Sequence, residues 1–277
     1  MKLKLFSYNY ENTVIHRLSG LTKLICFLLL TFAVMFSYDI RVILGMLIFS
    51  VLIMRAAKIT FSQIKTMVIY VLIFIVINAI ITYLFAPEQG VTLYGTRHVL
   101  FKFSARYTVT LEQLLYQTTK FFKYISVIPL GIIFLLTTNP SEFASSVSRV
   151  GVPYQASFAL SLTLRYFPDV QRVYHDISLA QQARGLELSG KAKFSDRFKN
   201  SLLIVIPLIF STLERIEVIT NAMDLRGFGK LKRRTWYSSA KLTCEDYLAL
   251  GVSLVLAAIT VLVSVFVNHG RFFNPFI

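Results

Sequence analysis

Two uncharged stretches of 22 residues each most constrain how this chain can fold. They run from Thr66 to Pro87 and from Tyr247 to Asn268. A helix of this length spans the roughly 30 Å hydrocarbon core of a bilayer. Of the 277 residues, 55% are hydrophobic and only 16% are charged, which is not the composition of a soluble protein. The sequence therefore predicts an all-α integral membrane protein.

The pattern of charges predicts about five transmembrane helices. The N-terminal membrane domain, residues 1–137, is expected to contain spans at about 24–38, 42–54, 66–86 and 116–137. A C-terminal segment, residues 244–277, supplies the fifth. Basic residues ahead of the first span place the N-terminus in the cytoplasm. Apolar spacing from Val99 to Lys123 predicts an amphipathic helix on the membrane surface before the fourth span.

The net charge of +15 has two explanations. A basic soluble protein would suggest nucleic acid as a partner, but a chain with these apolar stretches follows the positive-inside bias of membrane proteins. We therefore expect the lipid bilayer and acidic faces of cytoplasmic proteins as the counter-charges, and no nucleic acid.

Residues 138–243 differ in character from the rest of the chain. From Thr137 to Lys241, 15 Lys and Arg accompany 8 Asp and Glu, among apolar runs too short to be comfortable spans. We expect a cytoplasmic module of long helices packed beneath the membrane. One helix should begin at Phe167-Pro168-Asp169, and another should run from about Asp196 to Phe228 with a kink at Pro207.

This module contains one short pattern twice, at an offset of 42 residues. The copies read Ala180-Gln-Gln-Ala183-Arg184-Gly185-Leu186 and Ala222-Met-Asp-Leu-Arg226-Gly227-Phe228. In each copy, the alanine four residues before the arginine shares the arginine's helix face. The glycine suits the left-handed cap that ends a helix.

Each arginine could simply complement the dipole of its helix. Dipole compensation, however, does not require the matching alanines upstream. A small residue one turn below an arginine lets another protein's surface approach while the guanidinium reaches into it. We interpret the two copies as matched anchors for two similar grooves.

No pattern in the chain indicates catalysis, a metal site or a cofactor. The histidines have no metal-ligand spacing, and P-loop and GxSxG motifs are absent. The longest spans contain no ionisable residue, which disfavours a secondary transporter. The acids among the module's arginines are expected in ordinary ion pairs or on solvated faces: Asp169, Asp176, Glu214, Glu217 and Asp224.

The paired arginine–glycine motifs between membrane spans resemble the transmembrane T component of energy-coupling factor (ECF) transporters. The resemblance rests on Ala180 to Gly185 and, more specifically, on Asn221 to Phe228, and its layout extends over nearly the whole chain. One departure is Leu225, where the family commonly has alanine.

The resemblance implies a non-catalytic coupling subunit in the plasma membrane. Two cytoplasmic ABC-type ATPases would hydrolyse ATP, and a membrane-embedded S component would bind the vitamin or other micronutrient. The ATPase-docking residues would be Arg184, Gly185, Arg226 and Gly227, with Ala180, Ala183, Ala222, Leu186 and Phe228 beside them. The S component is expected to contact the apolar faces of residues 154–164 and 202–213.

Two other classes of protein stay open at this stage. A membrane enzyme or lipid-binding protein could hold a phosphate group with these arginines, which would then converge on one pocket. The membrane subunit of an ordinary ABC importer would also dock ATPases, usually through a single coupling loop.

Overall fold

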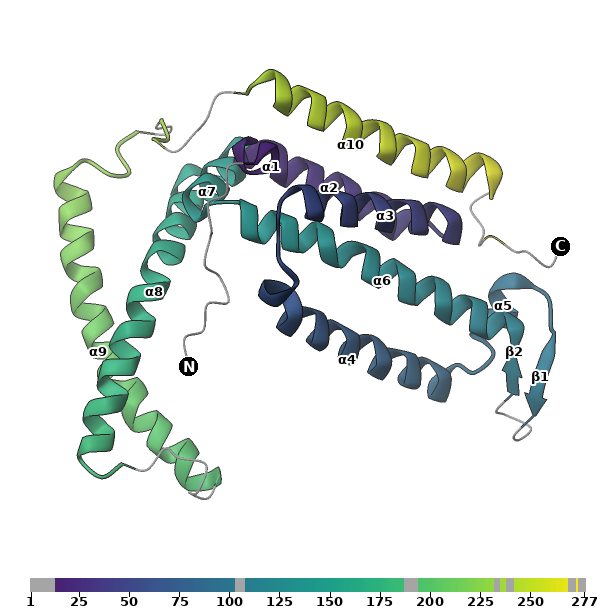
Figure 1. The fold of residues 1–277 in the computed structure, drawn as a ribbon. Helices are drawn as coiled ribbons and strands as arrows, with labels where there is room; N and C mark the ends of the chain where they lie inside the picture. Colours follow the sequence, from purple (N-terminus) through teal and green to yellow (C-terminus); the bar gives the residue numbers. More distant parts are fainter. Residues whose placement is uncertain are drawn as a thin grey trace. The chain divides into compact units, whose positions relative to one another are not determined.

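The computed structural model describes residues 13–102, 108–186, 194–231, 235–237, 242–268 and 273. The chain divides into two compact units (Figure 1). The first, here called the membrane unit, comprises Met1–Asn139 and Ala240–Ile277. The second, here called the coupling unit, comprises Pro140–Ser239.

Five long helices dominate the membrane unit, and they correspond to the five predicted spans. They are α2 (Gly20–Phe36), α3 (Ile40–Ala56), α4 (Phe61–Phe85), α6 (Leu111–Thr137) and α10 (Cys244–Leu262). Two short helices, α1 (Val14–Arg17) and α5 (Gln89–Tyr94), flank them, and α10 continues into a π-helical turn, η1 (Val263–Val267).

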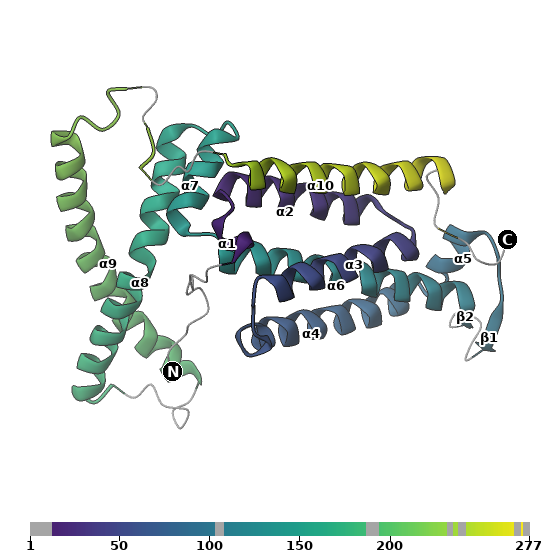
Figure 2. The same cartoon turned by 45° about the horizontal axis from the view of Figure 1, so that its top comes forward.

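The helices of the membrane unit pack around a small apolar core. Helix α2 packs against α10 and α6, while α3 and α4 pack against α6 (Figure 2). The core consists of five buried side chains from α2, α3 and α6: Leu30, Ala33, Val34, Met46 and Leu130. Beside it, the Phe27 and Phe134 rings stack with their centroids 5.1 Å apart.

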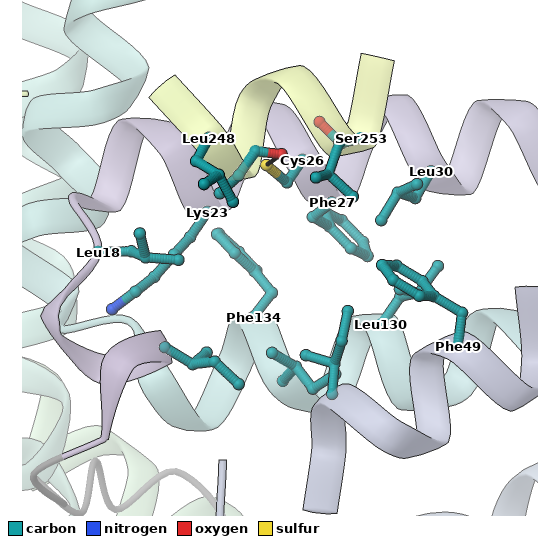
Figure 3. A pocket seen from close by; sticks show the side chains of 15 residues that line it. Leu18, Lys23, Cys26, Phe27, Leu30, Phe49, Leu130, Phe134, Leu248 and Ser253 are labelled. Carbon is teal, nitrogen blue, oxygen red and sulfur yellow. Dashed lines mark hydrogen bonds between the residues drawn. The ribbon is translucent and has the colours of Figure 1, made fainter. Parts of the chain in front are cut away.

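An apolar cavity of about 240 Å³ lies next to this core. Figure 3 shows Phe27 and Leu30 of α2, Leu130 and Phe134 of α6, and Leu248 of α10 around it. The interior contacts of the membrane unit therefore join α2 to α10, and both α2 and α3 to α6.

Three helices in the described part of the chain are long and apolar enough to cross a membrane. They comprise Ile64–Phe85, Leu111–Thr137 and Cys244–Val267, whereas α2 is a shorter apolar helix. Helix α4 exposes large apolar side chains, including Tyr70 and Phe85 at 70% and 79% exposure. This outer surface suits lipid, as expected for an all-helical membrane protein. The total of five spans stays a prediction.

The helix predicted from Val99 to Lys123 is wrong before Leu111, and the residues from Leu111 onward belong to the candidate span α6. Strand β1 (Val99–Lys102) pairs antiparallel with β2 (Thr108–Thr110), and α6 begins only at Leu111. The buried Glu112 carboxylate accepts the backbone N–H of His98 at 3.0 Å, which holds the end of the hairpin to the start of α6. The amphipathic spacing of the segment gives no information about this contact between residues distant in the sequence.

Two lysines on α6 have polar partners on neighbouring parts of the membrane unit. Lys120 Nζ donates to Thr82 Oγ1 at 2.9 Å, and Lys123 Nζ donates to the Ser37 carbonyl at 3.1 Å. Both lysines lie on the candidate span α6. Their long stems carry the ammonium groups to polar partners while the aliphatic part packs against apolar neighbours.

The coupling unit contains α7 (Pro140–Arg149), α8 (Tyr154–Ala183) and α9 (Phe194–Leu225). The prediction that a helix begins at Pro168 is wrong, because α8 is continuous from Tyr154 and includes this proline. A proline inside a helix removes one hydrogen bond, and a long helix with tertiary contacts tolerates that loss. Pro207 likewise lies inside α9.

Asp39 closes the turn between α2 and α3. Its carboxylate accepts the Arg41 backbone N–H at 2.9 Å and the Asn268 amide at 3.3 Å, and it pairs with the Arg41 guanidinium at 2.8 Å. Burial alone would raise the pKa of Asp39. The hydrogen bonds from Arg41 and Asn268 outweigh burial and lower this pKa below its ordinary value.

We expect Asp39→Ala to lower the free energy of unfolding by about 1 kcal/mol, because α3 loses its N-cap. Asp39→Asn keeps a capping oxygen, so its comparison with wild type measures the contribution of the charge alone.

Since the folded-state pKa of Asp39 is lowered, the stability from its charge is fully present above the unfolded-state pKa. It is lost as the pH falls through the folded-state pKa. Thermal unfolding in detergent from neutral to acidic pH should show wild type converging on Asp39→Asn, and a pH-independent difference would contradict this.

Candidate functional site

The first arginine–glycine motif forms the C-terminal end of α8. Arg184 is the C-cap, and Gly185 adopts a left-handed φ of +91°. The Gly185 N–H donates to the Gln182 carbonyl at 3.0 Å, and the Leu186 N–H donates to the Gln181 carbonyl at 3.0 Å. This is the hydrogen-bonding pattern of a helix closed by glycine.

The second motif ends α9 in the same way. Gly227 has a φ of +66°, and its N–H donates to the Asp224 carbonyl at 2.9 Å. The Phe228 N–H donates to the Met223 carbonyl at 3.0 Å. Every donor and acceptor lies 42 residues after its counterpart on α8, so the sequence repeat is also a structural repeat. The predicted glycine-terminated helix ends are confirmed.

The arginines and the alanines of both motifs lie on the surface of the coupling unit. The exposed residues are Ala180, Ala183, Arg184, Gly185, Ala222 and Arg226, and Gly227 and Leu186 are half-buried. The two helix ends therefore present a guanidinium beside small side chains, as the spacing predicts. Such a surface leaves room for another protein's backbone to approach.

Phe228 differs from the other predicted docking residues. Its ring lies 4.6 Å from that of Phe158 and 5.7 Å from that of Tyr154, measured between centroids. Trp236 joins the same cluster at 5.8 Å from Tyr154. The half-buried Phe228 thus attaches the end of α9 to the start of α8.

This aromatic cluster fixes the separation of the two motifs. Arg226 lies two residues before Phe228, beside the start of α8, whereas Arg184 follows the end of α8. Helix α8 has 30 residues, and a rise of 1.5 Å per residue makes it about 45 Å long. Figures 1 and 2 show α8 and α9 crossing, with their C-terminal ends at opposite ends of the pair. The two arginines do not converge on one pocket.

Leu225, which departs from the alanine common in the family, is an exposed apolar residue of the second motif. Its side chain is 90% exposed, directly before Arg226. A protein that binds the Arg226 end of α9 would therefore meet the Leu225 side chain as well. No pattern in the sequence distinguishes this exposed leucine from a buried one.

Asp169 behaves as an ordinary ion-pairing residue, as expected. It pairs with Arg172 at 3.7 Å on α8 and with Arg215 at 3.2 Å on α9. Exposed pairs of this kind contribute little to stability. Over the part of the chain that the structure describes, no group of three His, Cys, Asp or Glu side chains is placed to hold a metal ion.

We expect Gly185→Ala to lower the free energy of unfolding of the coupling unit by about 1–2 kcal/mol, because alanine is strained at positive φ. A Cβ at this position would meet no atom within 4 Å, so the cost arises from the backbone alone. Gly185→Asn should cost less, since asparagine tolerates this conformation. Thermal unfolding in detergent compares the three proteins, and equal stability of wild type and alanine variant would rule out the left-handed turn.

Similarity to known proteins agrees with this architecture. The family model CbiQ, described as cobalt transport protein, matches residues 11–237. The energy-coupling factor transporter transmembrane protein EcfT of Staphylococcus aureus (strain 04-02981) is 26% identical over 272 residues, covering 94% of this chain and 97% of the relative.

Two further relatives carry the same name. The protein from Exiguobacterium sibiricum is 27% identical, covering 90% of this chain and 92% of its own. The protein from Listeria innocua is 30% identical over 123 residues, covering 42% and 46% of the two chains. The family match includes both arginine–glycine helix ends. This chain therefore belongs to the CbiQ family, as a T component, the transmembrane subunit of energy-coupling factor transporters.

Proposed function

We propose that this chain couples ATP hydrolysis by two cytoplasmic ABC-type ATPase subunits to movement of a membrane-embedded S component that binds a vitamin or another micronutrient. The observation that carries the proposal is the matched pair of exposed arginine–glycine helix ends on α8 and α9. Each end docks one ATPase subunit. The chain itself hydrolyses no ATP, and it lies in the plasma membrane with its N-terminus in the cytoplasm.

The chemistry of the helix ends supports docking into a groove. A guanidinium has a planar fork of donors that suits carboxylates and carbonyl oxygens at a helix end. In each motif, the alanine one turn earlier leaves space for the rim of such a groove. The left-handed glycine changes the direction of the chain directly after the arginine, so the following residue does not continue the helix past the guanidinium.

The separation of the helix ends favours two docking sites over one binding pocket. A phosphate-binding enzyme would bring its arginines together, but these lie at opposite ends of a helix pair about 45 Å long. An ordinary ABC importer subunit would usually dock through one coupling loop. Two equivalent helix ends on one chain suit two similar ATPase subunits.

Helix α9 carries the surface that best fits the S component. Five large apolar side chains recur at helical spacing and are each 48–55% exposed: Leu202, Ile206, Ile209, Leu213 and Ile216. The large apolar side chains of residues 154–164, by contrast, are half-buried. We therefore place the S-component contact on α9 rather than equally on both predicted segments. A continuous exposed apolar stripe of this kind marks a surface that contacts another protein or lipid.

Replacing both anchors should detach the ATPases. We expect Arg184→Ala with Arg226→Ala to weaken ATPase binding by on the order of 2–4 kcal/mol for each anchor. The variant should still insert in the membrane, because both arginines are exposed on the coupling unit. Affinity purification from native membranes, followed by mass spectrometry, measures which proteins accompany each form.

The matched control is Arg172→Ala, which removes another exposed arginine from α8. Wild type and control should bring along two P-loop ATPases and a small hydrophobic protein. Wild-type chain that purifies alone, or a double variant that retains both ATPases at wild-type levels, would contradict the proposed function.

Leu225→Gln tests the hydrophobic part of the second docking site. Because the leucine is 90% exposed, the substitution should leave thermal stability unchanged and weaken ATPase binding by about 1–2 kcal/mol. Leu231→Gln, at a leucine 59% exposed beyond the motif, is the control. Titration of the purified membrane complex with ATPase gives both affinities. Equal affinities for the two variants and wild type would exclude Leu225 from the interface.

A further inference from the structure

The chain passes between its two units at two places, which we call the stems. The first stem follows the end of α6 at Thr137, and the second precedes the start of α10 at Thr243. Both residues belong to the membrane unit. Any movement of the coupling unit that reaches the membrane helices through the covalent chain passes through these stems.

Lys23 holds the first stem. Its ammonium group donates to the Thr137 carbonyl at 2.8 Å and to the His16 carbonyl at 3.0 Å. Lys23 is only 6% exposed and Thr137 is fully buried. Figure 3 shows the lysine nitrogen on the Leu18 side of the cavity, away from Phe27 and Leu30. The charge thus joins α1 to the carbonyl end of α6, where a helix dipole favours a cation.

Asp246 holds the second stem. Its carboxylate accepts the Thr243 backbone N–H at 2.8 Å and the Thr243 hydroxyl at 2.9 Å, which closes the start of α10. Its other oxygen accepts the Ser19 backbone N–H at 2.8 Å. Asp246 is 1% exposed and Ser19 is 4% exposed. The carboxylate thus connects α10 to the residue that precedes α2.

The two stems are therefore held by one corner of the chain, residues 16–23, where α1 meets α2. The Lys23–Thr137 and Ser19–Asp246 hydrogen bonds join residues that are 114 and 227 positions apart in the sequence. Both involve a buried charge and a backbone group, and they are stronger and costlier to break than neutral surface contacts. The neighbouring pair Arg17–Glu245 is 4.0 Å apart, and its side chains are 58% and 44% exposed, so this ion pair contributes little to stability.

We propose that Lys23 and Asp246 are positioning residues that hold the two stems at a fixed separation during the ATPase cycle. The inference rests on the proposed coupling function. With both stems attached to one corner, a displacement of the coupling unit moves α2, α6 and α10 together. If either attachment is lost, the distance between the two stems changes, and a displacement of the coupling unit no longer moves α2, α6 and α10 together.

Pulse electron paramagnetic resonance tests this proposal without requiring the transported substrate. Spin labels replace Leu135 on α6 and Leu248 on α10, which are 37% and 68% exposed, in a background with Cys26→Ala and Cys244→Ser. The complex is reconstituted in liposomes with its ATPases and measured without nucleotide and with trapped ATP. With Lys23 and Asp246 intact, the interspin distance should have one narrow distribution, the same in both states.

Lys23→Met and Asp246→Asn should each broaden or shift this distribution on addition of ATP, while ATPase co-purification and hydrolysis persist. Arg17→Gln and Glu245→Gln are matched controls at the same corner and should keep the narrow, nucleotide-independent distribution. Thermal unfolding reports whether each variant folds. An interspin distance distribution that stays narrow in both the Lys23→Met and the Asp246→Asn variant would overturn the proposal.

The interspin distance with Lys23 and Asp246 intact tests whether the separation of the stems is fixed, even if the variants fail to fold. An interspin distance that changes with ATP would contradict fixed stems, and an unchanged distance supports them. Loss of the proposed function would appear differently, as a wild-type chain that purifies without ATPases.

Discussion

The left-handed residue after each arginine is the constraint on which the coupling unit depends. An α-helix that ends with φ of +91° or +66° strongly favours glycine, and the turn that results leaves the preceding arginine at the exposed tip. The length of α8 then separates the two tips, and the aromatic cluster of Tyr154, Phe158 and Phe228 fixes the end of α9 beside the start of α8. Together, these features make two equivalent tips from one chain.

Buried polar residues play the corresponding part in the membrane unit. Lys23, Asp39, Glu112 and Asp246 are each at most 6% exposed. Lys23, Asp39 and Asp246 bond backbone groups at helix ends, and Glu112, at the start of α6, bonds the His98 backbone N–H ahead of β1. Free backbone groups at helix ends are costly away from water, so charged side chains that satisfy them are stabilising. Contacts of α2 with α10 and α6, and of α3 with α6, provide the apolar packing. The four charged residues add hydrogen bonds at the starts of α2, α3, α6 and α10 and at the end of α6.

The sequence was sufficient for features that depend on local chemistry. Long uncharged stretches predicted the membrane helices, and the arginine–glycine repeat predicted the two helix ends and the family. Features that depend on distant contacts were missed. Pro168 suggested a helix start but lies inside α8, and the hairpin before α6 is held by Glu112 and His98. Phe228 matched Leu186 by position, yet it packs within an aromatic cluster. The bonds of Lys23 and Asp246 span more than a hundred residues, beyond the reach of any local pattern.

The most direct test of the central claim is photo-crosslinking from the two equivalent positions that precede the arginines, Ala183 and Leu225. A photoreactive amino acid at either position, introduced in the native membrane, captures whatever contacts that helix end. We predict that each position crosslinks to an ATP-binding subunit, and that a chain with both substitutions captures two such subunits at once. Crosslinks only to lipid, or crosslinks from both positions to one and the same subunit, would contradict two separate docking sites.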